Sequence, residues 1–386
     1  MDQAKQLEIF KHIIDIKSVN DHEADVADYI ATLFEPYKDR VDVSRVTFAP
    51  GRDNLVIATK DAQGPVFGLS GHMDTVATGN LADWQTDPFK ATVKDGKLYG
   101  RGAADMKSGV AAIVCALLEM LDGTAPLPGP VKLLLTVGEE TGEYGAAQLT
   151  KEGYVDDLGA LVISEPGDDM KELTYTAKGV IDYKVTSLGK SVHSSYPDQG
   201  INAITNLLDF VNQVEGVLDQ FEHVENPVLG HQVSSVTKIG GGDQVNSIPS
   251  EAWVMGNIRT IPEHPNKEIY TALEGLVAKC NQLPDHQLKI EYSYPEEPMA
   301  GDPHSKLLQQ AQQVHDEMFD QAVKVVGSGG ANDGSEFSQA ENDFTTVLIG
   351  PGSASSHQSN EYCDLAVYYQ SIKYYEKLAQ LYFSEL

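Results

Sequence analysis

Several kinds of residue are scarce in this sequence, and each scarcity excludes a class of protein. Three cysteines, Cys115, Cys280 and Cys363, are spread along 386 residues, which argues against a disulfide framework. No apolar run approaches the length of a transmembrane helix. The first residues, 1 to 16, carry charges throughout instead of the apolar segment of a signal peptide. We therefore expect a cytoplasmic protein with no membrane partner.

Basic side chains are also few. The 28 lysines and arginines are outnumbered by 57 aspartates and glutamates, so the formal net charge is −29. A field of this sign repels nucleic acid and anionic membranes, and we expect neither as a partner. Only five arginines occur, so few residues can bind a carboxylate through two parallel hydrogen bonds. The acidity itself is most simply explained as a solvated surface.

The most informative stretch is Ser70–Thr75, which places a histidine and an aspartate at the end of an apolar run. That run, residues 64–69, is typical of a buried strand. His72 and Asp74 are two residues apart, so on a strand their side chains project to the same face. Such a pair suits a metal ligand with a carboxylate behind it that orients the imidazole. Taken alone, the pair is weak support for a metal site.

Two further apolar strands end in carboxylates. The run Val131–Val137 is followed by Glu139 and Glu140, and the run Ala160–Ser164 is followed by Glu165. Adjacent glutamates on a strand point in opposite directions, so we expect Glu139 and Glu140 to serve different roles. Three strand-to-helix transitions that each carry a metal-capable side chain predict an α/β sheet with a polar crevice along one edge.

Two other candidates lie in loops. Asp105 lies among small residues just before an apolar helix, residues 110–121. An acidic residue at this place can be explained as a helix N-cap, and taken alone this explanation is favoured. His357 lies in the loop after the predicted strand Thr345–Ile349 and supplies a second histidine at a strand end.

Residues 179–294 differ in pattern from the sequence on either side. Their apolar runs follow the order strand, helix, strand, strand, helix, strand, which is the order of a ferredoxin-like domain. The α/β pattern then resumes. We therefore expect an α/β/α domain with a mainly parallel sheet, formed by residues 1–178 and 295–386. A ferredoxin-like α+β domain, residues 179–294, would be inserted into it.

Taken together, these residues resemble the zinc-dependent hydrolase family that includes succinyl-diaminopimelate desuccinylase, acetylornithine deacetylase, aminoacylase and glutamate carboxypeptidase. The similarity covers essentially the whole chain. Its motifs are specific in combination, and they are His72–Val76, Gly100–Gly102 with Asp105–Lys107, Gly138–Glu140, Ser164–Pro166 and His357–Glu361. Within the insert, Gly189–His193 and Asn246–Pro249 match the motifs of the family's lid and dimerisation domain.

The resemblance implies a centre of two zinc ions, for which cobalt can substitute. Its five ligands would be two histidines and three carboxylates, namely His72, Asp105, Glu140, Glu165 and His357. Asp105 would bridge the two ions, with His72 and Glu165 completing one and Glu140 and His357 completing the other. Imidazole and carboxylate are the ligands that zinc takes in open catalytic sites.

The catalytic groups are implied by the same resemblance. Asp74 would stand behind the histidine of its motif. Glu139 would be the general base, which takes a proton from the attacking water and passes it to the leaving amine. His193 would act in the neighbouring subunit of a homodimer built through the lid domain. The peptide bond between Asp105 and Met106 would be cis.

Four residues match positions that bind the substrate in the family, namely Lys178, Asn246, Arg259 and Gly330. Arg259 would bind a substrate carboxylate, with an ordinary surface charge as the alternative. Asn246 would reach the scissile group, with a turn residue as the alternative. Gly330 belongs to Gly329–Ser335, which lacks a hydroxyl and an arginine that the desuccinylases carry there. This departure leaves the reaction type untouched and the acyl group open.

The implied reaction is hydrolysis of the amide bond of an N-acyl amino acid, a small-molecule substrate. Among the alternatives, succinyl-diaminopimelate desuccinylase comes first, acetylornithine deacetylase or a broader aminoacylase second, and a carboxypeptidase-type peptidase third. A non-catalytic binding protein comes last. Such a protein could lose the general base freely, whereas this chain has Glu139 together with all five candidate ligands.

Overall fold

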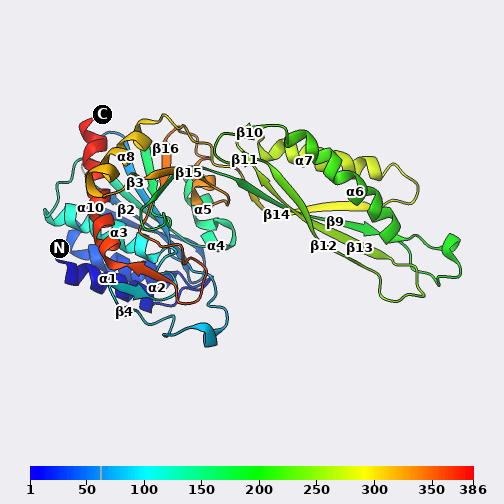
Figure 1. The fold of residues 1–386 in the computed structure, drawn as a ribbon, viewed down its shortest axis with the longest axis horizontal. Coiled ribbons are helices and arrows are strands. Elements are labelled where there is room, and N and C mark those ends of the chain that lie inside the picture. Colours follow the sequence, from blue (N-terminus) through cyan, green and yellow to red (C-terminus); the bar gives the residue numbers. More distant parts are fainter. Residues whose placement is uncertain (61–62) are drawn as a thin grey trace. The chain divides into compact units, whose positions relative to one another are not determined.

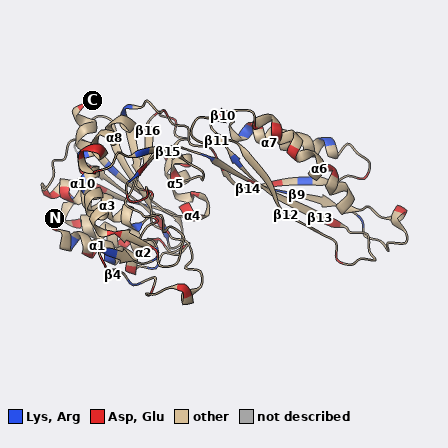
Figure 2. Cartoon of the chain, viewed as in Figure 1, with Lys and Arg blue, Asp and Glu red and all other residues tan. Residues whose placement is uncertain are grey.

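The computed structural model describes residues 1–60 and 63–386, and the chain forms two compact units (Figure 1). Unit 1 comprises Met1–Thr176, Gly301–Val326 and Asn332–Leu386, and unit 2 comprises Ala177–Ala300 and Gly327–Ala331. Among the described residues, no helix is long and apolar enough to cross a membrane. Aspartate and glutamate residues occur on elements of both units (Figure 2).

An eight-stranded sheet forms the centre of unit 1, with the strand order β1-β2-β6-β3-β7-β16-β8-β15. The four central strands β6, β3, β7 and β16 are parallel, while β1, β2 and β8 pair antiparallel. The strands are β1 (Val41–Ala49), β2 (Arg52–Thr59), β3 (Val66–His72), β6 (Val131–Thr136), β7 (Leu158–Ile163), β8 (Glu172–Ala177), β15 (Lys324–Ser328) and β16 (Thr345–Leu348). Parallel strands covered on both faces are apolar along their whole length, and every residue of β3 and β6 is buried.

The helices of unit 1 pack on this sheet and on one another. Helix α3 packs against α1, α10 and β3, and α10 also packs against α8 (Figure 1). Helix α3 also contacts β6, α2 lies on β1 and β2, and α5 contacts α9 and β6. The helices are α1 (Gln3–Asp15), α2 (Ala24–Phe34), α3 (Lys107–Asp122), α5 (Tyr144–Lys151), α8 (Lys306–Met318), α9 (Asp333–Phe337) and α10 (Leu365–Ser384). Nearly all of α3 is buried, as expected for a helix that is apolar on all sides. The prediction of an α/β domain with a mainly parallel sheet is confirmed.

A small three-stranded sheet in unit 1 joins segments that are far apart in sequence. It consists of β4 (Thr92–Lys94), β5 (Lys97–Tyr99) and β17 (Tyr362–Asp364), in the order β17-β5-β4. In its register Tyr362 pairs with Tyr99. This pairing brings the loop that contains His357 next to the segment that leads to Asp105.

Unit 2 is a four-stranded antiparallel sheet with two helices. Along the chain its main elements are β9 (Gly179–Leu188), α6 (Ala203–Leu218), β12 (Val233–Gly241), β13 (Glu251–Thr260), α7 (Asn266–Cys280) and β14 (Leu288–Glu296). The sheet order is β12-β13-β9-β14, and all neighbours are antiparallel. Alternate residues of β9 and β13 are buried in one core with apolar residues of α6 and α7. The predicted ferredoxin-like arrangement is confirmed.

Candidate metal centre and active site

Strand β3 ends at a histidine, His72, whose imidazole is completely buried. Its Nδ1 lies 3.0 Å from the backbone carbonyl oxygen of Asp74. A carbonyl oxygen can only accept a hydrogen bond, so in the neutral imidazole Nδ1 carries the proton. The carboxylate of Asp74 is farther from this nitrogen, at 3.5 Å. In this neutral tautomer the lone pair lies on Nε2, the nitrogen that faces Asp105, and this is the form of histidine that binds a metal ion.

The Asp74 carboxylate binds the segment that carries the two glutamates. It accepts hydrogen bonds from the backbone N–H groups of Glu139 and Glu140, both at 3.2 Å. These glutamates begin a short helix, α4 (Glu139–Gly142), after Gly138 with a φ of 71°. The expectation that they point in opposite directions is wrong. Left-handed Gly138 ends the extended conformation, and side chains in a helix turn by about 100° per residue.

Glu139 and Glu140 nevertheless face different histidines. Oε2 of Glu139 lies 3.9 Å from Nε2 of His72. Oε2 of Glu140 lies 3.0 Å from Nε2 of His357. The two neighbouring carboxylates are thus available for two different roles.

Asp105 lies between the two histidines. Its Oδ1 is 3.1 Å from Nε2 of His72, and its Oδ2 is 3.3 Å from Nε2 of His357. The explanation of Asp105 as a helix N-cap is wrong, because the N-cap residue of α3 is Met106, which makes no side-chain capping bond. The Asp105–Met106 peptide bond is cis, as predicted. A carboxylate with one oxygen toward each imidazole has the arrangement that can bridge two metal ions.

Glu165 follows β7 and faces the same histidine as Glu139. Its Oε1 lies 3.9 Å from Nε2 of His72. This oxygen is buried and has no hydrogen-bond partner within the described part of the chain. Buried polar atoms without a partner call for an explanation, and a bound cation supplies one. His357 is 55% exposed, so one of the candidate ligands borders solvent.

The carboxylates of this centre are crowded and buried. Burial is the main reason why the pKa values of Glu139 and Glu165 lie well above that of an ordinary glutamate, and neighbouring carboxylates raise them further. Burial would also raise the pKa of Asp105, but hydrogen bonds with His357 and His72 outweigh it and hold this pKa well below its usual value. Hydrogen bonds with Asp105 and Glu140 raise the pKa of His357 to about 10. The crowded carboxylates therefore make this centre suited to bind positively charged groups.

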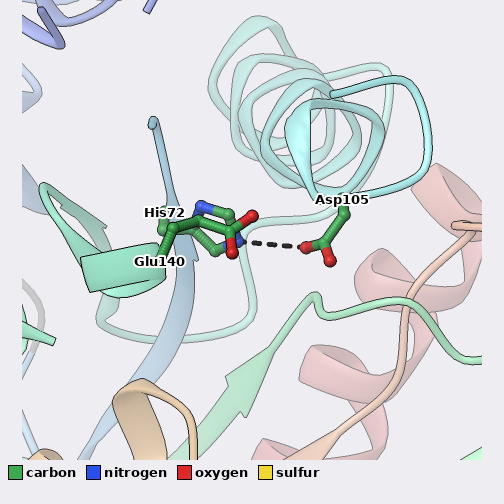
Figure 3. Close-up of side chains that lie close together, drawn as sticks. All are labelled: His72, Asp105 and Glu140. Atoms are coloured by element: carbon green, nitrogen blue, oxygen red, sulfur yellow. Dashed lines mark hydrogen bonds and ion pairs between the residues drawn. The ribbon is translucent and has the colours of Figure 1, made fainter. Parts of the chain in front are cut away.

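These residues fit divalent metal ions. His72, Asp105 and Glu140 offer ligand atoms that all lie within 4.8 Å of one another, and Figure 3 shows the imidazole and the two carboxylates facing each other. Imidazole nitrogen together with carboxylate oxygen is a donor set that suits zinc and related transition metals. The unpartnered oxygen of Glu165 supports the same interpretation.

The remaining five candidates belong to unit 2, namely Lys178, His193, Asn246, Arg259 and Gly330. Lys178 and Arg259 lie close enough to interact. Burial lowers the pKa of Lys178, and the positive charge of Arg259 lowers it further. Nζ of Lys178 donates to the backbone oxygen of His231 at 2.5 Å. The unit therefore holds a pair of cations at one end of β9 and β13.

His193 and Asn246 lie on adjoining segments of unit 2. The N–H of Ser194 donates to the backbone oxygen of Asn246 at 3.0 Å. Nδ1 of His193 accepts a hydrogen bond from the N–H of Ser195 at 3.2 Å, so in the neutral ring Nε2 carries the proton and can donate. Gly330 lies apart from this pair in sequence, and its N–H donates to the hydroxyl of Ser328 at 3.2 Å.

Two buried carboxylates are missing from the residues predicted from the sequence. Asp333 begins α9, accepts a hydrogen bond from the Thr136 hydroxyl at 2.5 Å, and has a pKa that burial raises to about 7. Glu361 accepts a hydrogen bond from the backbone N–H of Asp105. Both lie in segments that the sequence already singles out, Gly329–Ser335 and His357–Glu361. Their position in these motifs is the sequence signal that could have identified them.

Comparison with known proteins agrees with this site. The chain is 32% identical to a protein of Staphylococcus epidermidis described as a probable succinyl-diaminopimelate desuccinylase, over 99% of this chain and 98% of that protein. Its fold is similar to that of an M20 family metallo-carboxypeptidase of Sulfolobus solfataricus, with a TM-score of 0.82 and 17% identity over 100% of both chains. It is also similar to a dinuclear metal-binding peptidase of the M20 family from Bacillus subtilis, with a TM-score of 0.70 and 15% identity over 100% of this chain and 99% of that one.

The family itself is shown by a match along most of the sequence. Residues 68–381 match the profile of peptidase family M20/M25/M40. This range includes all the residues of the candidate metal centre. The chain therefore belongs to peptidase family M20/M25/M40 and is a metal-dependent hydrolase.

Proposed function

We propose that this chain is a two-zinc hydrolase that cleaves the amide bond of an N-acyl amino acid, with N-succinyl-diaminopimelate as the first candidate substrate. The observation that carries the proposal is the carboxylate of Asp105, which turns one oxygen toward each of two histidines. The identity of 32% with a probable succinyl-diaminopimelate desuccinylase over nearly the whole chain supports the choice of substrate. Cobalt is the expected replacement for zinc.

The distances suggest how the ligands would divide between two ions. His72, Asp105 and Glu165 would hold one ion, and Asp105, Glu140 and His357 would hold the other. In the first set, Nε2 of His72 lies 3.1 and 3.9 Å from carboxylate oxygens of Asp105 and Glu165. In the second set, Nε2 of His357 lies 3.3 and 3.0 Å from carboxylate oxygens of Asp105 and Glu140. When bound, such ions make water more acidic and polarise an amide carbonyl oxygen.

Glu139 would perform the proton transfers. Its Oε2 accepts the proton of the attacking water and later gives it to the nitrogen of the leaving amine, so the residue acts first as base and then as acid. Asp74 supports this role indirectly. Its carboxylate accepts from the backbone N–H of Glu139, and its carbonyl oxygen fixes the ring of His72. One residue thus positions both the proposed base and a proposed ligand.

An assay on a panel of substrates tests the proposal. Purified zinc-loaded protein would be tested with N-succinyl-diaminopimelate, N-acetylornithine, several N-acetyl amino acids and a dipeptide. We expect the highest kcat/KM for the succinyl substrate. A higher value for an acetyl substrate would favour the deacetylase or aminoacylase, and a higher value for the dipeptide a carboxypeptidase-type activity. Metal-loaded protein without turnover on any of them would favour a binding protein.

In this proposal the substrate is recognised by residues of unit 2. Arg259 would bind the substrate carboxylate, and the neighbouring charge of Lys178 would strengthen the attraction. Asn246 would contact the scissile amide group of the substrate. Gly330 would contact the substrate through its backbone. The two cations suit an anionic substrate in a chain whose net charge is −29.

Arg259→Ala is expected to lower kcat/KM for N-acyl amino acids by about 10- to 100-fold, since a hydrogen bond to a charged group contributes about 1.5–3 kcal/mol. Arg259→Lys should restore little of this loss, because an ammonium group lacks the planar fork that binds a carboxylate. Lys289→Ala, which removes an exposed charge from β14 of the same sheet, is the control. Unchanged kcat/KM across several substrates would make Arg259 a surface charge.

We also propose that residues 179–294 act as a lid and build a homodimer. Strand β12 lies at one edge of the sheet of unit 2, and its residues Val233, Val236 and Ile239 are 52%, 43% and 58% exposed. A long edge strand with exposed apolar residues is a template for pairing with another chain. In a two-fold dimer the same strand of each copy pairs with its equivalent.

His193 would then complete the active site of the other copy by donating to the carbonyl oxygen of the substrate. Loss of such a donor typically lowers kcat by about 10²–10³. Mixing His193→Ala with Glu139→Gln subunits tests this role. Each variant alone should be nearly inactive, whereas the mixed dimer has one site with both an intact Glu139 and an intact His193 and should regain part of the activity. Demonstrated subunit exchange without any recovery would show that His193 does not act in the partner's site.

A further inference from the structure

The buried carboxylate of Glu361 accepts four hydrogen bonds from one short segment. Its Oε1 accepts from the backbone N–H groups of Ala104 and Asp105, at 2.7 and 2.9 Å. Its Oε2 accepts from Nη1 of Arg101 and the N–H of Gly102, at 2.6 and 3.0 Å. A carboxylate offers about four acceptor positions, so the segment 101–105 uses the full capacity of this side chain.

The backbone of Glu361 strengthens the same connection. Its carbonyl oxygen accepts from the N–H of Gly100 at 3.1 Å. The next residue, Tyr362, pairs with Tyr99 in the small sheet. Residues 101–105 form turns rather than a helix or strand, and Gly102 has a φ of 86°. In this segment, Glu361 therefore accepts the hydrogen bonds of backbone N–H groups that would donate to backbone carbonyl groups in a helix or strand.

We propose that Glu361 is a positioning residue that fixes the bridging carboxylate of Asp105 and so sets the affinity of both metal ions. It holds the backbone of Asp105 directly, and it lies four residues from His357, whose Nε2 is 3.3 Å from Oδ2 of Asp105. The segments that contribute these two groups are thus tied together by one side chain. The inference rests on the proposed two-metal centre.

The expected effect is distinct from the loss of a single ligand. Without the carboxylate, three backbone N–H groups and a guanidinium lose their acceptor in a buried place, and the segment must rearrange to satisfy them. Because Asp105 would contact both ions, this rearrangement weakens both sites together. Changes to residues that orient metal ligands typically cost about 10- to 100-fold in metal affinity or activity.

Glu361→Gln tests the inference with little change in size. The amide nitrogen cannot accept a hydrogen bond, so one pair of donors faces another donor. Zinc affinity, measured by competition with a chromophoric chelator, should fall by about 10- to 100-fold at both sites. Glu119→Gln is the matched control. Glu119 is equally buried, accepts from Nε2 of Gln6 at 2.7 Å and pairs with Lys373, all outside the segments that carry the candidate ligands.

Hydrogen exchange of the metal-free protein gives a second measurement. Exchange of the backbone amides of residues 100–106 should be faster in Glu361→Gln than in the wild type and in Glu119→Gln. If Glu361→Gln does not fold, Glu361→Asp takes its place. Its carboxylate keeps the charge but is one methylene shorter, and its zinc affinity should still fall below that of the wild type.

Three results would overturn the inference. The first is zinc affinity in the Glu361 variant equal to that of Glu119→Gln. The second is a loss confined to one of two ions, and the third is unchanged exchange of residues 100–106. Failure of the proposed function would appear separately. The chelator titration counts the ions bound by the wild type without any substrate, and the substrate panel reports turnover without any variant.

Discussion

Glu139→Gln is expected to lower kcat by about 10²–10⁴ while both metal ions stay bound. Glutamine has nearly the shape of glutamate, but its amide cannot accept the proton of the attacking water. The hydrogen bond between this residue and Asp74 is made by the backbone N–H, so the substitution leaves it in place. None of the five proposed ligands is changed. The variant therefore separates proton transfer from metal binding.

Steady-state kinetics and elemental analysis of the same preparation check this result. The metal content should match that of the wild type, and KM should change little compared with kcat. Glu152→Gln, which makes the same change of charge at an exposed position just after α5, is the control and should keep full activity. Turnover close to that of the wild type would make Glu139 a structural carboxylate and would reopen the question of the base.

The ends of the strands could be predicted from the sequence, and the orientation of the side chains there only in part. The apolar run before His72 is long and uninterrupted, so both the strand and its last residues are clear from the pattern. Glu139 and Glu140 follow a similar run, but one left-handed residue, Gly138, turns the chain into α4 before them. A glycine permits such a conformation without requiring it, so the pattern alone could not distinguish strand from helix there.

The roles of Asp105 and Glu361 depend on contacts between distant parts of the chain. Before an apolar helix, an aspartate among small residues taken alone favours an N-cap, and only its distances to His72 and His357 indicate a metal ligand instead. Glu361 meets the segment 101–105 across a separation of more than 250 residues. No local pattern of charge or hydrophobicity encodes such a meeting, although the motif that contains Glu361 indicates its region.

Asp105→Ala is expected to be the most damaging change among the five proposed ligands. Each of the other four would contact one ion, so Glu140→Ala, for example, removes a contact on the side of His357 only. Asp105 has an oxygen on each side, at 3.1 and 3.3 Å from the two imidazoles. The Asp105 variant should therefore bind less than one equivalent of zinc after gel filtration, whereas Glu140→Ala should keep about one of two.

Removal of the metal from the wild type should have the same effect on activity as this substitution. A chelator should abolish turnover, and zinc or cobalt should restore it, because both ions accept imidazole and carboxylate ligands. Restoration is the decisive control, since it separates loss of metal from unfolding. For Asp105→Ala, added zinc should restore little, because the bridge itself is missing. Full activity in wild-type protein that elemental analysis shows to be metal-free would rule out the metal centre as the site of catalysis.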